Sequence, residues 1–339
     1  MPCKDSAHSE ILRARNECWP PGARGYDTLA AFQEWVSGLK SARVRFIREQ
    51  PLRAGEHFAL KVVRLVVPSN PQHRRPIPAC AQVAAATITI TLLEPLAGTS
   101  VSGDSPVSRV WLASTATGDR VVAKFYFPSL FIPEEQYNRQ DNDFILPRQC
   151  ALTEEVAYNI LQSAQGAWLP YYLGRNEVNL SHGEMADVAL FEYINGRSLL
   201  DHKHAQPGGI THKKSDDPES HFQVVHRQHQ KWFKRLREIT HEMHDAGVTH
   251  CDLYGRNILV PESNLNDLVF VDFETARDDM EGGGNDLRNA VLGFTCCDDH
   301  VDELYSWCGK NKLDVLEWYL NFPTITSDLY WFAGSARNR

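Results

Sequence analysis

The spacing of apolar residues predicts a helix followed by two strands near the start of the chain. Apolar side chains recur at helical spacing within residues 26–40, at Leu29, Phe32, Trp35, Val36 and Leu39. This period places them along one stripe, as in an amphipathic helix. Apolar runs at 44–47 and 58–67 then predict two strands.

The next region has the pattern of a β-rich lobe with one helix. Runs rich in β-branched and aromatic residues predict strands at 86–93, 107–113, 120–127 and 188–193. Residues 150–165 have the period of a helix.

The remainder of the chain is predicted to be mainly helical. Residues 222–246 have the period of one long helix, and short apolar runs follow at 258–260 and 268–273. The stretch after residue 274 also has a mostly helical pattern. Strands with one helix, followed mostly by helices, predict an α+β chain whose β-rich lobe precedes a helical lobe.

Breaks in this pattern divide the chain into segments. Polar residues and the Pro20-Pro21-Gly22 run predict a poorly ordered N-terminus, and clustered prolines predict a linker after the first elements. The expected segments are the N-terminus at 1–25, an N-terminal extension at 26–67, the linker at 68–80, an N-lobe at 86–194, and a C-lobe at 195–339 with a polar insertion at 201–221.

Composition narrows the classes of partner. The 339 residues carry a net charge of -8 and are 42% hydrophobic, values of an ordinary globular chain. This charge argues against a protein that binds nucleic acid or a membrane surface through bulk electrostatics. No signal peptide or membrane-spanning run is recognised, and the eight cysteines show no paired spacing. We therefore expect free thiols and a cytoplasmic or nuclear location.

Three polar residues in the second half carry the strongest chemical signal. Asp252 and Asn257 lie five residues apart, ahead of an apolar run, and Asp272 ends the next apolar run. A carboxylate on a loop can orient a hydroxyl proton, whereas Asn and Asp oxygens suit Mg²⁺. The order and spacing of these residues predict a site that binds Mg²⁺ and orients a hydroxyl group.

These segments resemble the protein-kinase-like superfamily. Its catalytic loop H-R-D-L-x-x-x-N corresponds to the segment from His250 to Asn257, and its D-F-G turn to Asp272-Phe273-Glu274. The resemblance implies that Asp252 is the catalytic base and that Asn257 and Asp272 bind Mg²⁺. It also implies a bilobal protein-kinase-like fold, with a β-rich N-lobe and a mainly helical C-lobe.

The same resemblance assigns a lysine and its partner in the N-lobe. Val121-Val122-Ala123-Lys124 is similar to the V-A-I-K strand, which makes Lys124 the predicted phosphate-binding lysine of ATP. The next helix offers Glu154 and Glu155 as its ion-pair partner. Periodicity leaves both open, and the family pattern favours Glu154.

Further nucleotide contacts follow from the resemblance. The segment 190–196 resembles the hinge, where the carbonyl of Glu192 and the amide of Ile194 would pair with adenine. The candidates for apolar contacts with the nucleotide are Val110, Ala123 and Leu259.

The sequence departs from the family pattern in four ways, and the last two bear on the choice of substrate. The glycine-rich loop is missing, and Cys251 replaces the arginine that reads a phosphorylated activation loop. Glu274 replaces the glycine of D-F-G, so the turn resembles that of choline-kinase-like and aminoglycoside-phosphotransferase-like enzymes. Only 65 residues follow Glu274, as in abbreviated kinase-like proteins of filamentous fungi.

The sequence therefore predicts an ATP-dependent phosphotransferase that moves the γ-phosphate of ATP to a hydroxyl acceptor. Protein Ser/Thr is the favoured acceptor, with a small molecule as the alternative. A nucleotide-binding pseudokinase that serves as an interaction module is a third hypothesis. Retention of Lys124, Asp252, Asn257 and Asp272 together counts against it.

Overall fold

The computed structural model describes residues 29–50, 52–63, 65, 74–82, 87–97, 107–131, 146–205, 218–277 and 286. The chain divides into two compact units. Unit 1 comprises residues 1–194 and 272–278, and unit 2 comprises residues 195–271 and 279–339. The predicted C-terminal helical stretch and the predicted disordered N-terminus lie outside the described residues.

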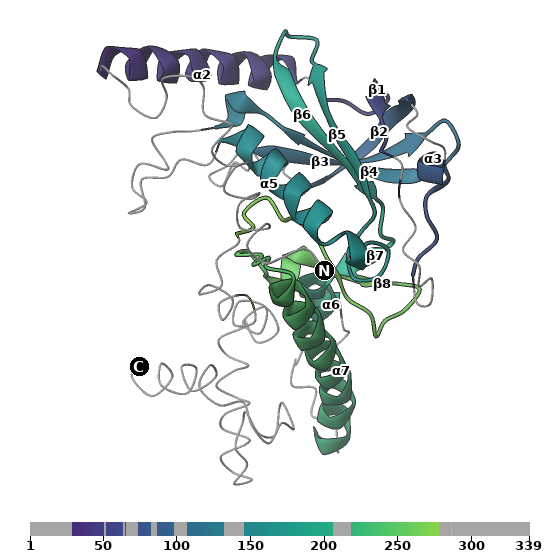
Figure 1. Cartoon of the computed structure of the whole chain (residues 1–339). Helices are drawn as coiled ribbons and strands as arrows, with labels where there is room; N and C mark the ends of the chain where they lie inside the picture. The colour runs from purple at the N-terminus through teal and green to yellow at the C-terminus, as the bar shows by residue number, and fades with distance from the viewer. Residues whose placement is uncertain are drawn as a thin grey trace. The chain divides into compact units, whose positions relative to one another are not determined.

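Unit 1 is built around one antiparallel sheet (Figure 1). Its elements are α2 (Leu29–Glu49), β1 (His57–Lys61), α3 (Ala79–Gln82), β2 (Thr87–Ala97), β3 (Ser108–Thr115), β4 (Arg120–Tyr126), the 3-10 helix η1 (Pro128–Leu130), α5 (Pro147–Ile160), the 3-10 helix η2 (Gln162–Ala164), β5 (Tyr172–Asn179) and β6 (Met185–Glu192). The four strands predicted between residues 86 and 193 are confirmed as β2, β3, β4 and β6, and the predicted helix as α5.

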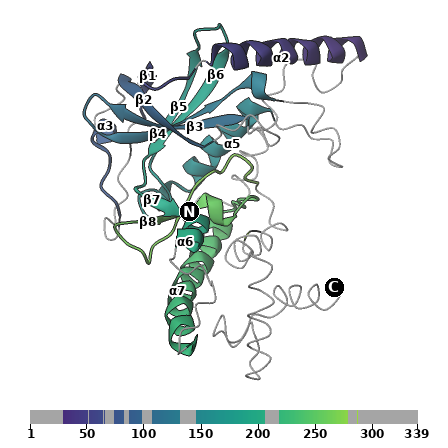
Figure 2. The ribbon, with the colours of Figure 1, turned by 180° about the vertical axis from the view of Figure 1, so that it is seen from behind.

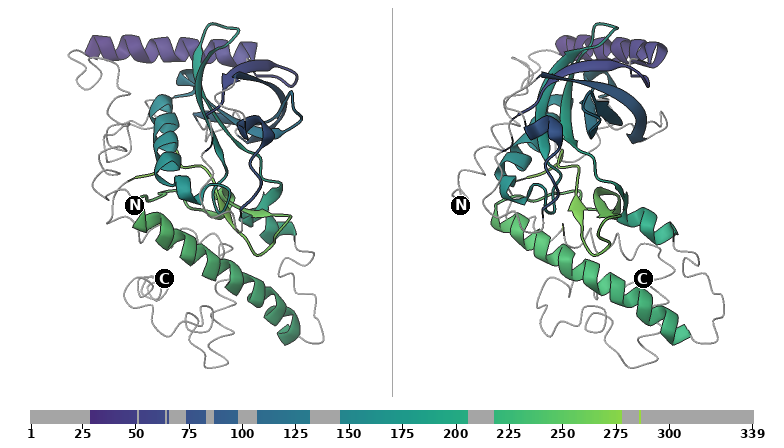
Figure 3. Two further views of the ribbon diagram at one scale, coloured as in Figure 1. Left: turned by 45° about the vertical axis from the view of Figure 1, so that its right-hand side comes forward. Right: turned by 90° about the vertical axis from the view of Figure 1, so that its right-hand side faces the viewer.

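The sheet order is β1-β2-β3-β4-β6-β5, and its two edges meet at one end. The Val63 amide donates to the Leu173 carbonyl at 2.8 Å, and Lys61 exchanges backbone hydrogen bonds with the Asn176 side chain. Figure 3 shows the resulting strong curvature of the strands. The sequence did not predict β5, one of the strands that make this closure.

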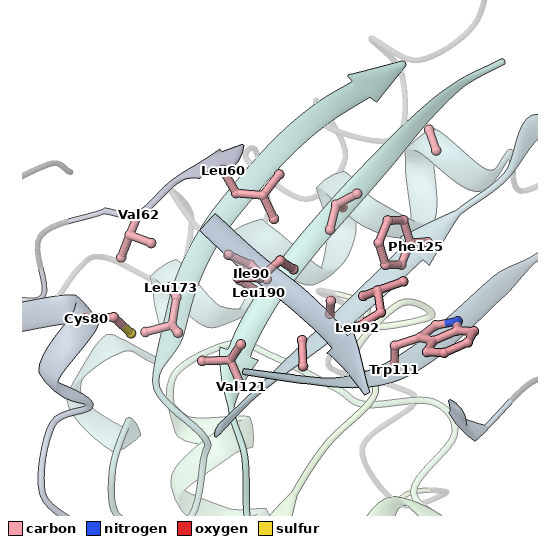
Figure 4. Close-up of a cluster of buried hydrophobic side chains, with 14 of the residues drawn as sticks. Leu60, Val62, Cys80, Ile90, Leu92, Trp111, Val121, Phe125, Leu173 and Leu190 are labelled. Atoms are coloured by element: carbon pink, nitrogen blue, oxygen red, sulfur yellow. The ribbon is translucent and has the colours of Figure 1, made fainter. Parts of the chain in front are cut away.

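Alternate side chains of the strands form the core of unit 1. In β4, Val121, Ala123 and Phe125 are fully buried in it, and Leu190 of β6 joins them. Figure 4 shows Val121, Phe125 and Leu190 in one cluster with Leu60, Ile90 and Leu92 from β1 and β2. Because strand side chains alternate between the two faces, the residues between them point to the other face.

Residues 44–47, predicted as a strand, belong to helix α2, so that prediction was wrong. Val36 and Phe46 are buried or half-buried, whereas Val44 and Ile47 are 64% and 47% exposed. Val36 and Phe46 are ten residues apart, close to three helical turns, so both lie on the face of the helix that meets the unit. The Phe46 ring packs on Phe127 with centroids 4.7 Å apart.

The predicted proline-rich linker and N-terminal extension are not separate from the sheet where the structure describes them. His57–Lys61 pairs with β2 as an edge strand, and the predicted strand 58–67 ends at Lys61. Residues 74–82 pack on unit 1 through Arg74 and Arg75 and include helix α3. The Arg74 and Arg75 side chains bind carbonyl and carboxylate groups and so hold this segment in place. The proline content of the segment does not predict these contacts.

In its described residues, unit 2 has one long helix and a small antiparallel sheet in the order β7-β8-β9 (Figure 2). Its elements are β7 (Gly196–Ser198), α6 (Leu199–Ala205), α7 (Pro218–Asp245), the 3-10 helix η3 (Gly255–Asn257), β8 (Ile258–Pro261) and β9 (Val269–Phe270). The predicted long helix is confirmed as α7, which buries Trp232, Leu236, Ile239 and Met243.

The polar insertion predicted at 201–221 is partly regular structure. Its first residues lie in α6 and its last in α7, and residues 206–217 lie outside the described part. Together the two units confirm the α+β class, while the bilobal kinase arrangement stays a prediction. None of the helices in the described ranges is both long and apolar enough to span a membrane.

Candidate active site

Lys124 lies on the face of the sheet opposite the core of unit 1. Its strand neighbours Ala123 and Phe125 point into the core, so the lysine points the other way. Its cross-strand partners on the same face are Val110 of β3 and Ala189 of β6. Helix α5 covers part of this face, where the Tyr158 ring meets Phe191 with centroids 5.1 Å apart.

Three carboxylates surround the Lys124 ammonium. Glu154 Oε2 of α5 lies 3.1 Å from Nζ, Glu274 Oε2 lies 3.0 Å from it, and Asp272 forms a shorter ion pair. The Tyr126 hydroxyl donates to Glu154, and Nζ lies 5.1 Å from the centroid of the Tyr126 ring. The lysine and Glu154 side chains are only 6% and 1% exposed, whereas those of Glu274 and Asp272 are 19% and 34% exposed, so the cluster is buried on the side of Glu154.

The charges of the cluster shift the pKa values of its members. Burial alone would lower the pKa of Lys124, but Asp272, Glu154 and Glu274 outweigh it and hold that pKa well above its usual value. Burial raises the pKa of Glu274 to about 7, against the opposing effect of Lys124. Lys124 is therefore a fixed positive charge, as a phosphate-binding residue must be.

The structure places Glu154, and not Glu155, beside Lys124. Glu155 instead accepts from Arg175 Nε at 2.8 Å, and the same guanidinium donates to Asp187 at 2.5 Å. The two neighbouring glutamates thus point to different strands. Helical periodicity could not separate them, because both flank the apolar stripe of α5.

Ala123 does not lie where the sequence analysis expected it. It is fully buried in the core, opposite Trp111 and Leu190 in the strand ladder, and so faces away from Lys124. Val122, two residues before the lysine, is half-buried and shares the lysine face. The alternation of strand side chains would have identified Val122, and it places Val110 correctly on that face.

The turn after Asp272 is attached to helix α5. The Phe273 amide donates to Glu154 Oε1 at 3.0 Å, and its ring packs on Tyr158 with centroids 5.6 Å apart. Asp272 itself has φ of +73°, a left-handed conformation that costs a non-glycine residue free energy. One glutamate, Glu154, therefore binds both the lysine and the backbone of the Asp-Phe-Glu turn.

In unit 2, Asp252 and Asn257 are joined directly. The Asn257 amide nitrogen donates to the Asp252 carbonyl at 2.8 Å and to its Oδ2 at 2.9 Å. Arg256 binds both carboxylate oxygens of Asp252 at 2.8 Å, with its own side chain 57% exposed. Arg256 and Asn257 lie in the 3-10 helix η3, and both bind Asp252, so the loop presents one carboxylate with a positive charge beside it.

Two further residues, His250 and Asp286, hold the backbone of this loop. His250 is fully buried; its Nδ1 accepts from the Asp252 amide at 3.3 Å, so Nε2 carries the proton donated to the Val271 carbonyl at 3.0 Å. Asp286 accepts from the amides of His250 and Cys251 at 2.6 and 2.8 Å. Asp286 was not predicted from the sequence, because a single Asp outside any motif carries no local signal.

Cys251 occupies a strained position in the loop. It has φ of +66°, and within the described residues only Gln50 and Asp272 are other non-glycine residues with positive φ. Asp286 accepts hydrogen bonds from the amides of Cys251 and of its neighbour His250, and these two bonds hold the conformation in place. Strained backbone that is held in this way is typical of functional loops.

Asn257 and Asp272 fit the chemistry of a magnesium ligand. Since the Asn257 nitrogen makes both bonds to Asp252, its carbonyl oxygen is the atom left to coordinate a cation. The Asp272 side chain is 34% exposed, unlike Glu154. Among the described residues, no group of three or more His, Cys, Asp and Glu side chains is arranged to hold a metal ion. A bound Mg²⁺ would therefore need phosphate and water oxygens as well.

The predicted adenine contacts are distributed over both units. Glu192 ends β6 and Ile194 is buried at the last position before unit 1 gives way to unit 2. The Glu192 side chain is bound by Arg75 and by the Tyr171 amide. Leu259 of β8 is half-buried, whereas its neighbours Ile258 and Val260 are fully buried.

Comparison with known proteins gives one family match. Residues 216–289 match the Lipopolysaccharide kinase (Kdo/WaaP) family, a range shorter than half of the chain that includes Asp252, Asn257, Asp272 and Asp286. No curated protein matches the chain significantly. The family match indicates that the protein is a kinase, a phosphotransferase, and places the matched residues within the protein-kinase-like superfamily.

Proposed function

We propose that the protein transfers the γ-phosphate of ATP to a hydroxyl group of a sugar or another small molecule. In this proposal Lys124 binds the α- and β-phosphates, Asp272 and Asn257 hold Mg²⁺, and Asp252 orients the acceptor hydroxyl. Catalysis of this kind depends on positioning and charge neutralisation. The magnesium ion would supply charge neutralisation at the phosphates.

The observation that carries the proposal is the buried ion cluster of unit 1. Lys124 and Asp272 are 148 residues apart in the sequence, yet the Lys124 ammonium is in direct contact with both Glu154 and Asp272. A buried lysine with three carboxylates costs desolvation free energy that a hydrophobic group would avoid. Retention of such a cluster supports a role in binding an anionic nucleotide and its cation.

Two features favour a sugar or small-molecule acceptor over protein Ser/Thr. The matched family is described as a lipopolysaccharide kinase family. Glu274 also occupies the position of the D-F-G glycine and lies 3.0 Å from Lys124, as part of the cluster. The turn thereby keeps the likeness to small-molecule kinases that its sequence indicated.

The pseudokinase hypothesis predicts a different outcome for the same site. The sequence lacks the glycine-rich loop that covers the phosphates in the family, and residues 98–106, between β2 and β3, lie outside the described part. However, the ion cluster around Lys124 and the joined Asp252 and Asn257 side chains retain the groups that chemistry requires. A protein that only binds nucleotide has no chemical need for both the ion cluster and the joined Asp252 and Asn257 side chains.

The first experiment separates nucleotide binding from turnover. Thermal unfolding is measured with ATP, with Mg²⁺ and with both, and then phosphoryl transfer from labelled ATP is followed with a pool of saccharides, a glycolipid preparation and a protein mixture. We expect stabilisation by Mg-ATP and label transfer to a saccharide or glycolipid. Transfer to proteins alone would favour a protein kinase, and stabilisation without transfer to any acceptor would favour a pseudokinase.

A further inference from the structure

Arg75 connects the segment before the sheet to the end of β6. Its guanidinium donates to both Glu192 carboxylate oxygens, at 2.8 and 3.1 Å. It also donates to the carbonyls of Ala167 and Leu169, at 2.5 and 2.6 Å. A planar guanidinium that makes four such bonds fixes the position of the Glu192 carboxylate.

The rest of this contact is equally specific. Glu192 Oε2 accepts from the Tyr171 amide at 3.0 Å, and the Tyr171 hydroxyl donates to the Arg75 carbonyl at 2.9 Å. The Arg75 amide donates to the Gly166 carbonyl at 2.8 Å. Gly166 has φ of +77°, and a Cβ there would lie 2.2 Å from the Tyr171 hydroxyl, so only glycine fits.

Glu192 is also the residue whose backbone carbonyl is proposed to pair with adenine. Its side chain is 10% exposed, and the Arg75 side chain is 19% exposed, so water competes little for either group. The Glu192 amide donates to the Tyr171 carbonyl at 2.9 Å, so the backbone and the side chain of Glu192 are both bound to Tyr171 at the end of β6.

We propose that Arg75 is a positioning residue for base recognition: it holds the backbone at Glu192 and Ile194 in the conformation that pairs with adenine. The inference rests on the proposed function and adds to it a role for the segment at 74–82. This segment would then set the preference for the adenine base without touching the nucleotide. The phosphate-binding residues around Lys124 would act independently of it.

The test compares two ligands that differ in the base. ATP carries adenine and phosphates, whereas inorganic tripolyphosphate carries phosphates alone, and both are titrated calorimetrically with Mg²⁺ into the full chain. In Arg75→Lys we expect the Kd of ATP to rise about tenfold, since a bidentate charged hydrogen bond is lost, while the Kd of tripolyphosphate is unchanged. Tyr171→Phe should also raise the ratio of the ATP Kd to the tripolyphosphate Kd, by a smaller factor.

Arg175→Lys is the matched control. Arg175 is 18% exposed, binds two carboxylates and lies in the same unit, but its partners are Glu155 and Asp187 rather than Glu192. We expect this variant to leave the ratio of the two Kd values unchanged. Circular dichroism and tripolyphosphate binding show that each variant is folded.

Three outcomes would overturn the inference. An equal weakening of both ligands by Arg75→Lys means that the residue supports the fold in general, and an unchanged ATP Kd means that the contact is irrelevant to the base. If Arg175→Lys changes the ratio as much as Arg75→Lys, the effect is not specific to Glu192. Failure of the unmodified protein to bind ATP would instead reject the proposed function, and this inference with it.

Discussion

The Lys124 cluster of unit 1 (Lys124, Glu154, Asp272 and Glu274) and the Asp252 loop of unit 2 (residues 250–257) are stabilised by different interactions. Around Lys124, three carboxylates share one buried ammonium, so negative charge is in excess. At Asp252, one carboxylate is bound by an exposed arginine and by a buried asparagine. The first region is held mainly by charge, whereas the second is held mainly by hydrogen bonds to its backbone.

This difference indicates which region is adapted to binding and which to orientation. Excess negative charge beside a lysine suits a site that takes up a cation together with phosphates. A loop whose backbone is fixed by Asp286 and His250 suits a group that must keep one direction during reaction. Substitutions in the two regions should therefore affect different quantities.

The largest effect is expected for Asp252→Asn. The substitution removes the charge that orients the acceptor hydroxyl but retains the shape of the side chain, so turnover should fall at least about a hundredfold. The Kd of Mg-ATP should change little. Asp267→Asn is a suitable control, because the Asp252 and Asp267 side chains are each 27% exposed in unit 2. Equal turnover in wild type and Asp252→Asn would sink the assigned role.

Lys124→Met should affect stability and binding together. It leaves Glu154, Asp272 and Glu274 without their cation, and the free energy of unfolding should drop by about 3 kcal/mol. Mg-ATP stabilisation should also disappear. Arg175→Met removes a comparable cation from Glu155 and Asp187, so urea denaturation should show a similar loss while Mg-ATP stabilisation persists. If both variants lose that stabilisation, the cluster has no special role in binding.

Asp286→Asn tests the backbone anchor of the loop. The buried carboxylate accepts two amide bonds, and an asparagine can offer only one oxygen to them, so we expect a loss of about 1–3 kcal/mol in stability. Turnover should fall more than ATP affinity, since the affected loop carries Asp252. Asp245→Asn, an exposed position at the end of α7, should change neither quantity.

The smallest effect concerns Glu274 and pH. Its pKa is raised from 4.5 to about 7 by burial, so the folded protein retains a proton that the unfolded chain releases at lower pH. The contribution of Glu274 to stability is therefore complete at low pH and is lost as the pH rises through about 7. Urea denaturation of Glu274→Gln should show a flatter dependence on pH in this window than the unmodified protein. Identical slopes in the two proteins would contradict the shift.

Much of the local structure of this protein was predictable from periodicity. Four strands between residues 86 and 193, helix α5 and helix α7 follow from the spacing of apolar residues. The wrong strand at 44–47 shows the limit of this approach, since a short apolar run fits a strand and an exposed helix face equally well. Strand β5, with its glycine and charged residues, gave too weak an apolar pattern to be predicted.

The chemistry of the candidate site was determined by the sequence, and its geometry by the tertiary structure. Residue types and spacing singled out Asp252, Asn257 and Asp272, because short motifs encode loops whose geometry is local. The resemblance to the protein-kinase-like superfamily was needed to add Lys124, which lies on strand β4.

The choice of Glu154 over Glu155, the inward orientation of Ala123, and the contacts of Asp286 and Arg75 depend on segments far apart in the chain. Only packing of these segments against one another fixes such contacts, since neither periodicity nor spacing records which distant groups a buried side chain meets.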